Sequence, residues 1–128
     1  MENETITTQT QKVWVDKDGI IRNTVLPNAE ITLAEAKIVV QAIIKITKGK
    51  RSPIFVDSRQ IKIMTREARQ YLASEESTRI LSAIAVLVAS PISKIIGKFF
   101  INFSKPFMPT QLFTNKNDAL AWLKEFLK

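Results

Sequence analysis

Side chains that could bind an anion gather in one short stretch of the chain, residues 57–69. Asp57 and Arg59 directly follow an apolar run, and Thr65, Arg66 and Arg69 come after a short loop. Guanidinium groups bind carboxylates and phosphates through paired hydrogen bonds, so an arginine cluster here suits an anionic partner. The structural alternative, which we favour, is that Asp57 pairs with Arg59 or Arg69 and simply holds the loop.

Thr65 has two interpretations, a phosphorylation site and a helix cap. It stands directly in front of a segment, residues 66–72, that we expect to be helical. A threonine at such a position usually accepts a hydrogen bond from a backbone N–H of the first turn. We therefore expect Thr65 to be the N-cap of this helix.

The residues of enzyme active sites are largely missing. The chain has no cysteine and no histidine, which excludes disulfides, thiol nucleophiles, imidazole bases and the usual zinc ligands. Glu75 and Glu76 are adjacent, and neighbouring side chains on a helix diverge by about 100°, so they do not share a site. We expect no catalytic residue, no metal and no cofactor, and hence a protein that is not an enzyme.

A second candidate surface is apolar. Residues 92–103 carry large apolar side chains at the spacing of an amphipathic helix, and an apolar loop follows. We expect one stripe of this helix to face the core, made up of Ile92, Ile95, Ile96, Phe99 and Phe103. Three further side chains are candidates for an apolar interface or a ligand groove, namely Phe100, Phe107 and Met108.

The elements that position these residues begin with a hairpin. Residues 5–15 and 20–26 are rich in β-forming side chains, and a turn cluster with Gly19 separates them. A first helix starts at Thr32, which forms a capping-box pattern with Glu35, and ends at Lys48-Gly49. Residues 53–57 form a short strand, residues 58–64 a loop, and a second helix follows.

The rest of the chain alternates strands with helices. Residues 82–88 are continuously apolar, which is typical of a strand that is buried on both faces. Ser90-Pro91 begins the amphipathic helix, residues 110–113 form a last strand, and a final helix starts near Asn115 and covers one face. The sequence therefore predicts a single α/β domain over residues 1–128. We expect a mixed sheet of four to five strands, an N-terminal hairpin followed by βαβαβα, with about four helices.

The strand, loop and helix of residues 55–68 resemble the corresponding segment of STAS domains, the anti-sigma-factor antagonists typified by SpoIIAA. The chain from about residue 5 onward more closely resembles a group of uncharacterised bacterial SpoIIAA-like proteins. The stretches that carry this resemblance are residues 31–37, 56–59, 67–75, 82–88, 96–100 and 121–124. The resemblance implies a SpoIIAA-like fold and a role in binding a partner protein.

The chain departs from the STAS pattern at the phosphorylated position. Partner-switching STAS proteins carry Asp-Ser-Ser-Gly before this helix, and a kinase phosphorylates the first Ser. These positions are Thr65, Arg66, Glu67 and Ala68 here, so Arg66 stands where the phosphoacceptor would be. This substitution favours an anionic group docked against the loop, or a structural salt cluster, over a phosphate added to it.

Charge and hydropathy limit the classes of partner that we expect and the location of the protein. The net charge is +7, but the basic residues are spread along the chain and no aromatic side chains accompany their densest run, residues 48–51. This pattern disfavours nucleic acid. The polar N-terminus does not resemble a signal peptide, and no apolar run is long enough to span a bilayer, so we expect a cytoplasmic protein.

Two functional hypotheses remain open. The leading one is a non-enzymatic, STAS-like regulatory module that binds a protein partner or forms a homodimer, with residues 57–69 as its contact surface. The alternative is a binding or carrier protein for a small apolar or acyl ligand, held under residues 92–108; this alternative rests partly on the resemblance of STAS-like folds to lipid-handling modules.

Overall fold

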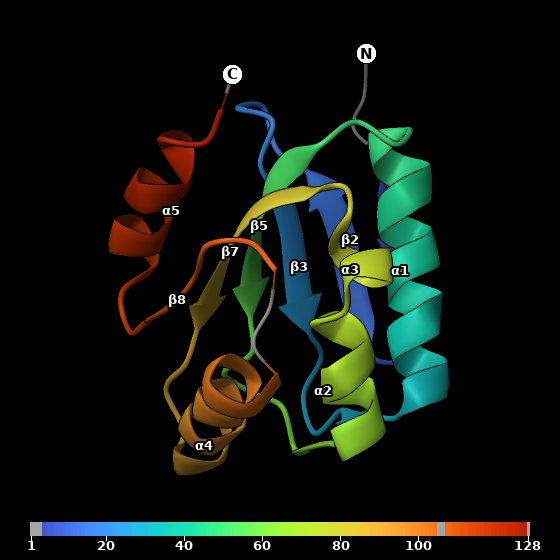
Figure 1. The fold of residues 1–128 in the computed structure, drawn as a ribbon, viewed down its shortest axis with the longest axis vertical. Coiled ribbons are helices and arrows are strands. Elements are labelled where there is room, and N and C mark those ends of the chain that lie inside the picture. Colours follow the sequence, from blue (N-terminus) through green and yellow to red (C-terminus); the bar gives the residue numbers. More distant parts are fainter. Residues whose placement is uncertain (1–3, 105–106, 128) are drawn as a thin grey trace.

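The computed structural model describes residues 4–104 and 107–127, without the side chains of residues 103 and 104 (Figure 1). Its centre is a six-stranded mixed sheet. In spatial order the strands are β1 (Thr5–Thr7), β2 (Gln11–Val15), β3 (Ile21–Val25), β5 (Ser52–Asp57), β7 (Leu81–Leu87) and β8 (Thr110–Phe113). The first three strands pair antiparallel, and β3, β5, β7 and β8 run parallel to one another.

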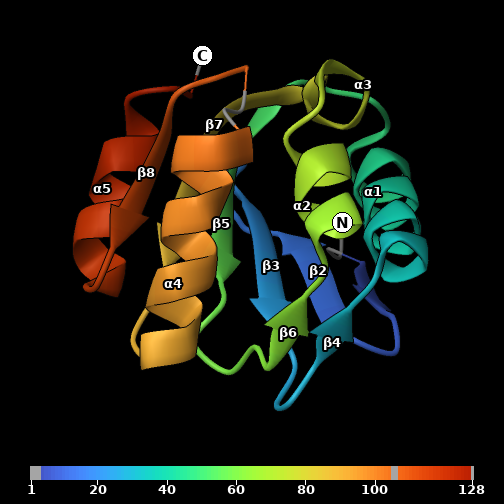
Figure 2. The ribbon, with the colours of Figure 1, turned by 60° about the horizontal axis from the view of Figure 1, so that its bottom comes forward.

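Helices cover both faces of this sheet (Figures 1 and 2). On one face lie α1 (Leu33–Thr47), α2 (Arg66–Leu72) and α4 (Pro91–Phe99), with the short α3 (Glu75–Thr78) after α2. A π-helical turn, η1 (Phe100–Ser104), continues α4. The other face is covered by α5 (Lys116–Lys124), whose Ala119 and Leu123 pack against Phe55 and Leu87. The predicted last helix over one face is thus confirmed.

The sheet has more strands than the sequence predicted. Residues 5–15 are two strands, because Thr8 Oγ1 accepts hydrogen bonds from the backbone N–H groups of Thr10 and Gln11 and interrupts the ladder. A separate two-stranded parallel sheet joins β4 (Glu30–Ile31) to β6 (Ile63–Met64). The strand β6 lies in the segment that we expected to be a loop throughout. A two-residue strand leaves no periodic signal, so only its distant partner reveals it.

Four of the five α-helix starts in the described residues were predicted correctly from their capping residues, whereas the short α3, capped by Ser74, was not expected. Thr32, Thr65, Ser90 and Asn115 are N-caps whose side-chain oxygens each accept a hydrogen bond from a backbone N–H three residues later. The capping box at Thr32 is only half formed. The carboxylate of Glu35 instead accepts a hydrogen bond from Thr10 Oγ1, at 3.0 Å.

The orientation of α4 corrects the sequence analysis. Three residues that we expected in the core are exposed: Ile92 by 49%, Ile95 by 54% and Phe99 by 42%. The helix turns Ser93 and Gly97 towards the sheet instead, and both are buried. A Cβ on Gly97 would lie 2.9 Å from Leu112 Cδ2, so any larger residue there requires the Leu112 side chain to shift.

The reason for this orientation is local crowding at Gly97. It packs against Leu112 of β8 and against Val88, just beyond β7, and this contact leaves no room for a large side chain. Of the predicted core stripe, Ile96 is half-buried and packs against a buried cluster that includes Val25, Ile31 and Ala68. Phe100, a candidate for an apolar interface or a ligand groove, is buried. The side chain of Phe103 lies outside the described residues.

Candidate functional site: an apolar pocket between the sheet and two helices

Asp57 and Arg59 form a paired contact at the end of β5. Arg59 Nη2 and Nε donate hydrogen bonds to Asp57 Oδ2 and Oδ1 at 2.7 and 2.9 Å, and the Arg59 backbone N–H adds a third at 3.2 Å. Partial burial raises the pKa of Asp57, but the hydrogen bonds and charge of Arg59, together with Lys116, outweigh it and hold this pKa below its ordinary value. The structural alternative predicted that Asp57 pairs with Arg59 or Arg69, and the partner in the structure is Arg59.

The predicted anion-binding residues are not brought together. Successive side chains of a strand point to opposite faces of the sheet. Phe55 packs on the α5 side, and Asp57, two residues later, therefore lies on that side as well. Arg66 and Arg69 belong to α2, on the other side of the sheet. No hydrogen bond or ion pair within residues 4–104 and 107–127 joins the two sets.

The residues of α2 have separate roles. Thr65 caps the helix, with its hydroxyl accepting from the Ala68 N–H at 3.2 Å. Arg66, at the position of the STAS phosphoacceptor, is exposed. The Arg69 guanidinium lies over the ring of Phe99 on α4, 5.2 Å from its centroid. Arg69 thus links two helices by a cation–π contact.

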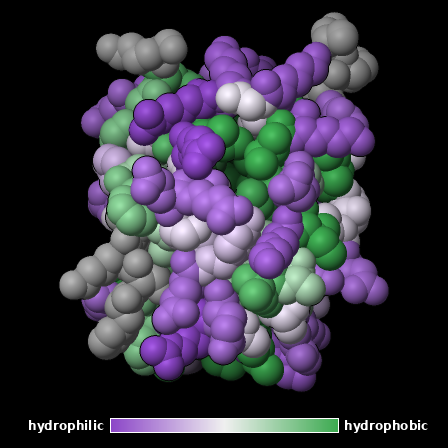
Figure 3. Space-filling model, turned by 45° about the vertical axis from the view of Figure 1, so that its right-hand side comes forward, coloured by the Kyte–Doolittle hydropathy of each residue, from purple (hydrophilic) through white to green (hydrophobic). Residues whose placement is uncertain are grey.

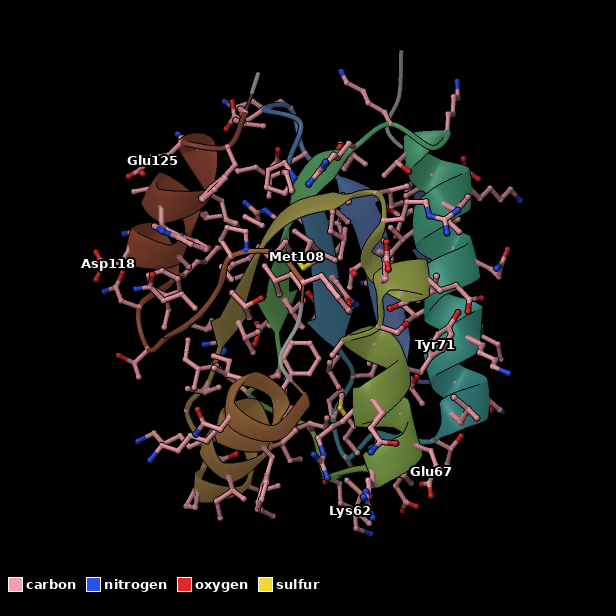
Figure 4. The ribbon with its side chains drawn as sticks, in the orientation of Figure 1. Lys62, Glu67, Tyr71, Met108, Asp118 and Glu125 are labelled. Carbon is pink, nitrogen blue, oxygen red and sulfur yellow. The ribbon has the colours of Figure 1, made fainter. Side chains whose placement is uncertain are left out.

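A pocket of about 100 Å³ lies between the sheet and the α1, α2 and α4 side. Most of its lining is aliphatic, and ten of the twenty lining residues come from β3, β5, β7 and α1. Phe100 closes one part of it, so this residue of the predicted apolar groove does face a cavity. Phe107 is 70% exposed, and Met108 (labelled in Figure 4) packs against the core without lining the pocket.

The pocket opens between α2 and α4. Four lining side chains keep partial exposure while the others are buried: Val56, Met64, Leu72 and Ile96. Val56 belongs to a central strand, so water reaches it only through a gap in the helical layer. Ile96 on α4 and Leu72 on α2 flank that gap. Figure 3, which brings the α1 side forward, shows a largely hydrophilic surface with apolar side chains exposed between the polar ones.

The polar groups of the pocket are neutral. Ser58 Oγ donates a hydrogen bond to the Leu87 carbonyl at 2.9 Å, and Ser77 Oγ donates to the Tyr71 carbonyl at 2.6 Å. The two remaining polar residues, Gln11 and Asn23, bond to each other. Among the lining residues that the structure describes there is no lysine, arginine, aspartate or glutamate. The pocket therefore suits an uncharged molecule.

Gln11 and Asn23 were missed by the sequence analysis, although a signal was present. Asn23 alternates with Ile21 and Val25, so it lies on the face of β3 that these two residues turn to the core. A polar residue on an otherwise apolar face of a buried strand marks either a hydrogen-bond network or a site.

Tyr71, Glu75 and Glu76 do not line the pocket. Tyr71 points from α2 towards α1 (Figure 4), and burial, with a smaller effect of Glu76, raises the pKa of its hydroxyl. Glu75 and Glu76 are exposed. Within the described parts of the chain, no three acidic residues are grouped as a metal site would need. None of the helices in these parts is long and apolar enough to cross a bilayer.

Comparisons with known proteins define the family and the fold. A family model described as a domain of unknown function, DUF7793, matches residues 13–127. A solved structure of an uncharacterised DUF3478-family protein with a SpoIIAA-like fold, from Shewanella loihica PV-4, has a TM-score of 0.59 at 12% identity. It covers 95% of this chain and 92% of that one, which confirms the SpoIIAA-like fold.

A second solved structure is a protein of unknown function from Arthrobacter sp. FB24. It is 27% identical, covers 92% of this chain and 95% of its own, and has a TM-score of 0.36. The search among curated proteins found no match.

Proposed function

The chain belongs to the DUF7793 family, a domain of unknown function, and we propose that it binds a small apolar ligand in the pocket that opens between α2 and α4. The pocket itself carries this proposal. Protein interiors are close-packed and hold few voids larger than a water molecule. A fitting ligand therefore gains van der Waals contacts with this lining that the empty pocket lacks.

The size of the pocket indicates the size of the ligand. Dry apolar cavities of about 150 Å³ bind molecules such as benzene. The present pocket is somewhat smaller, but its opening lets a longer molecule extend between Leu72 and Ile96 towards the solvent. A single aromatic ring or a short acyl group fits this description. The proposal is for a binding or carrier role without catalysis, in the cytoplasm.

A mutation at the opening tests this proposal. Ile96→Trp places a bulky ring where a half-buried side chain lines the opening, so it should abolish binding of toluene, measured from chemical-shift changes in two-dimensional NMR spectra. Ile95→Trp is the matched control, because Ile95 neighbours it on α4 but is 54% exposed on the outward face. Saturable binding that is lost only in Ile96→Trp supports the proposal. Wild-type spectra that toluene leaves unchanged would refute it.

The second candidate function, a protein-interaction module, is favoured by one observation. Ile92, Ile95 and Phe99 form an exposed apolar stripe on α4, at i, i+3 and i+7. Contiguous apolar surface of this kind marks contact sites more often than single exposed residues do. We propose this stripe as a contact surface for this role, in addition to the surface at residues 57–69.

Self-association is the direct test of this second function. Wild-type protein should sediment as a dimer at high concentration, and Ile95→Asp should sediment as a monomer. Ile38→Asp, on α1 and 47% exposed, is the control for adding a charge at an exposed isoleucine. A wild-type protein that stays monomeric would rule out the homodimer.

A further inference from the structure

We propose that the ligand of this pocket carries a hydrogen-bond donor, a hydroxyl or N–H group, that pairs with Asn23, and that ionised carboxylates are rejected. This inference rests on the proposed binding function and names the chemical class of the ligand. It follows from how Asn23 is buried, how its amide is oriented, and which charges the pocket lacks.

Asn23 is a polar side chain inside an apolar wall. It is 5% exposed and lines the pocket between the positions of Ile21 and Val25 on β3. The neighbouring strand β2 contributes Gln11, whose Oε1 accepts a hydrogen bond from Asn23 Nδ2 at 3.0 Å. Burying two amides on this face costs free energy unless their donors and acceptors are paired.

A chain of hydrogen bonds leads from Asn23 to a carboxylate. Gln11 Nε2 donates to Thr10 Oγ1 at 3.5 Å, and Thr10 Oγ1 donates to Glu35 Oε1 at 3.0 Å. An ionised carboxylate can only accept hydrogen bonds, so the Thr10 hydroxyl must donate to it. Thr10 then accepts from the Gln11 amide nitrogen, which leaves the Gln11 oxygen to accept from Asn23.

The direction of these hydrogen bonds determines which acceptor atom of Asn23 has no partner. Asn23 must use its nitrogen towards Gln11, so its oxygen, Oδ1, is the acceptor that remains. Nothing among the described residues donates a hydrogen bond to Asn23 Oδ1. Among the described residues, Ser82 Oγ is the side-chain polar atom that is both fully buried and without a hydrogen-bond partner. Asn23 Oδ1 also has no partner, so it is not fully buried. Because Asn23 lines the pocket, we infer that Oδ1 faces the pocket.

The missing charges exclude anions. A carboxylate in the pocket would find no described lysine or arginine in the lining to balance its charge. Moving an isolated carboxylate from water into such surroundings is strongly unfavourable. A neutral hydroxyl, in contrast, donates to Asn23 Oδ1 while its apolar body contacts the aliphatic lining. The pocket is therefore matched to small alcohols and phenols.

The test compares phenol with toluene, which has nearly the same shape and no donor. Dissociation constants are measured by NMR titration for the full chain and for Asn23→Leu. The double variant Gln11→Leu/Asn23→Leu serves as a second probe, because replacing both hydrogen-bonded partners by apolar groups is close to neutral for folding. Circular dichroism and thermal unfolding confirm that each variant is folded.

The expected result is a change in preference. Losing one hydrogen bond to a buried acceptor should shift the ratio of phenol to toluene affinity about tenfold towards toluene in both variants. Benzoate should bind more weakly than phenol to the wild type. An unchanged ratio, or benzoate binding as tight as phenol binding, would overturn this inference while leaving the apolar binding function intact. If neither phenol nor toluene binds the wild type, the binding function itself fails.

Discussion

The stability of the protein should change in opposite directions when one methylene group is added to Val86, on β7, or to Val88, just beyond its end. Val86 lines the pocket, whereas Val88, just beyond the end of the strand, is buried in the same core cluster without lining it. Val86→Ile extends into empty space, and Val88→Ile extends into packed atoms. The pair therefore tests whether the pocket is real space, independently of any ligand.

The expected magnitudes follow from packing energetics. Burying one additional methylene group without strain contributes about 0.8 kcal/mol, so Val86→Ile should raise the free energy of unfolding by about that amount. Val88 Cγ1 would lie 3.3 Å from a Cβ on Gly97, which shows how tightly α4 packs there. Val88→Ile should thus lower the free energy of unfolding by about 1–3 kcal/mol.

Urea denaturation monitored by circular dichroism measures both changes, and melting temperatures should move by a few degrees in opposite directions. Val86→Ile should also weaken toluene binding, since it occupies part of the same volume. Equal destabilisation by the two substitutions would refute the reasoning, because it would mean that Val86 has no free space beside it.

Three further predictions concern the stability of the fold. The pKa of Asp57 is held below its ordinary value, so the carboxylate stabilises the protein at neutral pH, and this contribution is lost as the pH falls from about 4 through the folded pKa. In urea titrations, the stability of Asp57→Asn should therefore depend less on acid pH than that of the wild type. Thr65→Ala should lower the free energy of unfolding by about 1 kcal/mol through loss of the α2 cap, and Thr114→Ala, at an exposed site, should change it little. Gly97→Val should lower the melting temperature more than Gly97→Ala, because even one Cβ comes within 2.9 Å of Leu112 and alanine regains about 1 kcal/mol of helix propensity.

Features that depend on local interactions could be predicted from the sequence. The four N-caps were identified because a capping side chain bonds to the backbone only three residues away. The last strand, at residues 110–113, was predicted with its observed bounds. The contact between Asp57 and Arg59 was anticipated as the structural alternative for the same reason, since it spans two residues.

Features that depend on distant partners could not be predicted. The strands β4 and β6 exist because Glu30 and Ile31 pair with residues more than thirty positions later. The face that α4 turns inward was assigned wrongly, because hydrophobic periodicity ranks Ile95 and Phe99 above Ser93 and Gly97. Gly97 faces inward because Leu112 of β8 leaves no room for a large side chain there, and the sequence does not show that Leu112 lies opposite.

The sequence by itself thus determined the class of the protein, four of its helix starts, its SpoIIAA-like fold and the shortage of the usual catalytic groups. Only the tertiary structure decided where a ligand could bind. It separated Asp57 and Arg59 from Arg66 and Arg69 by placing the sheet between them. The pocket arises where the sheet and the helices over it fail to close completely around Asn23, and no local pattern encodes a volume that distant side chains leave empty.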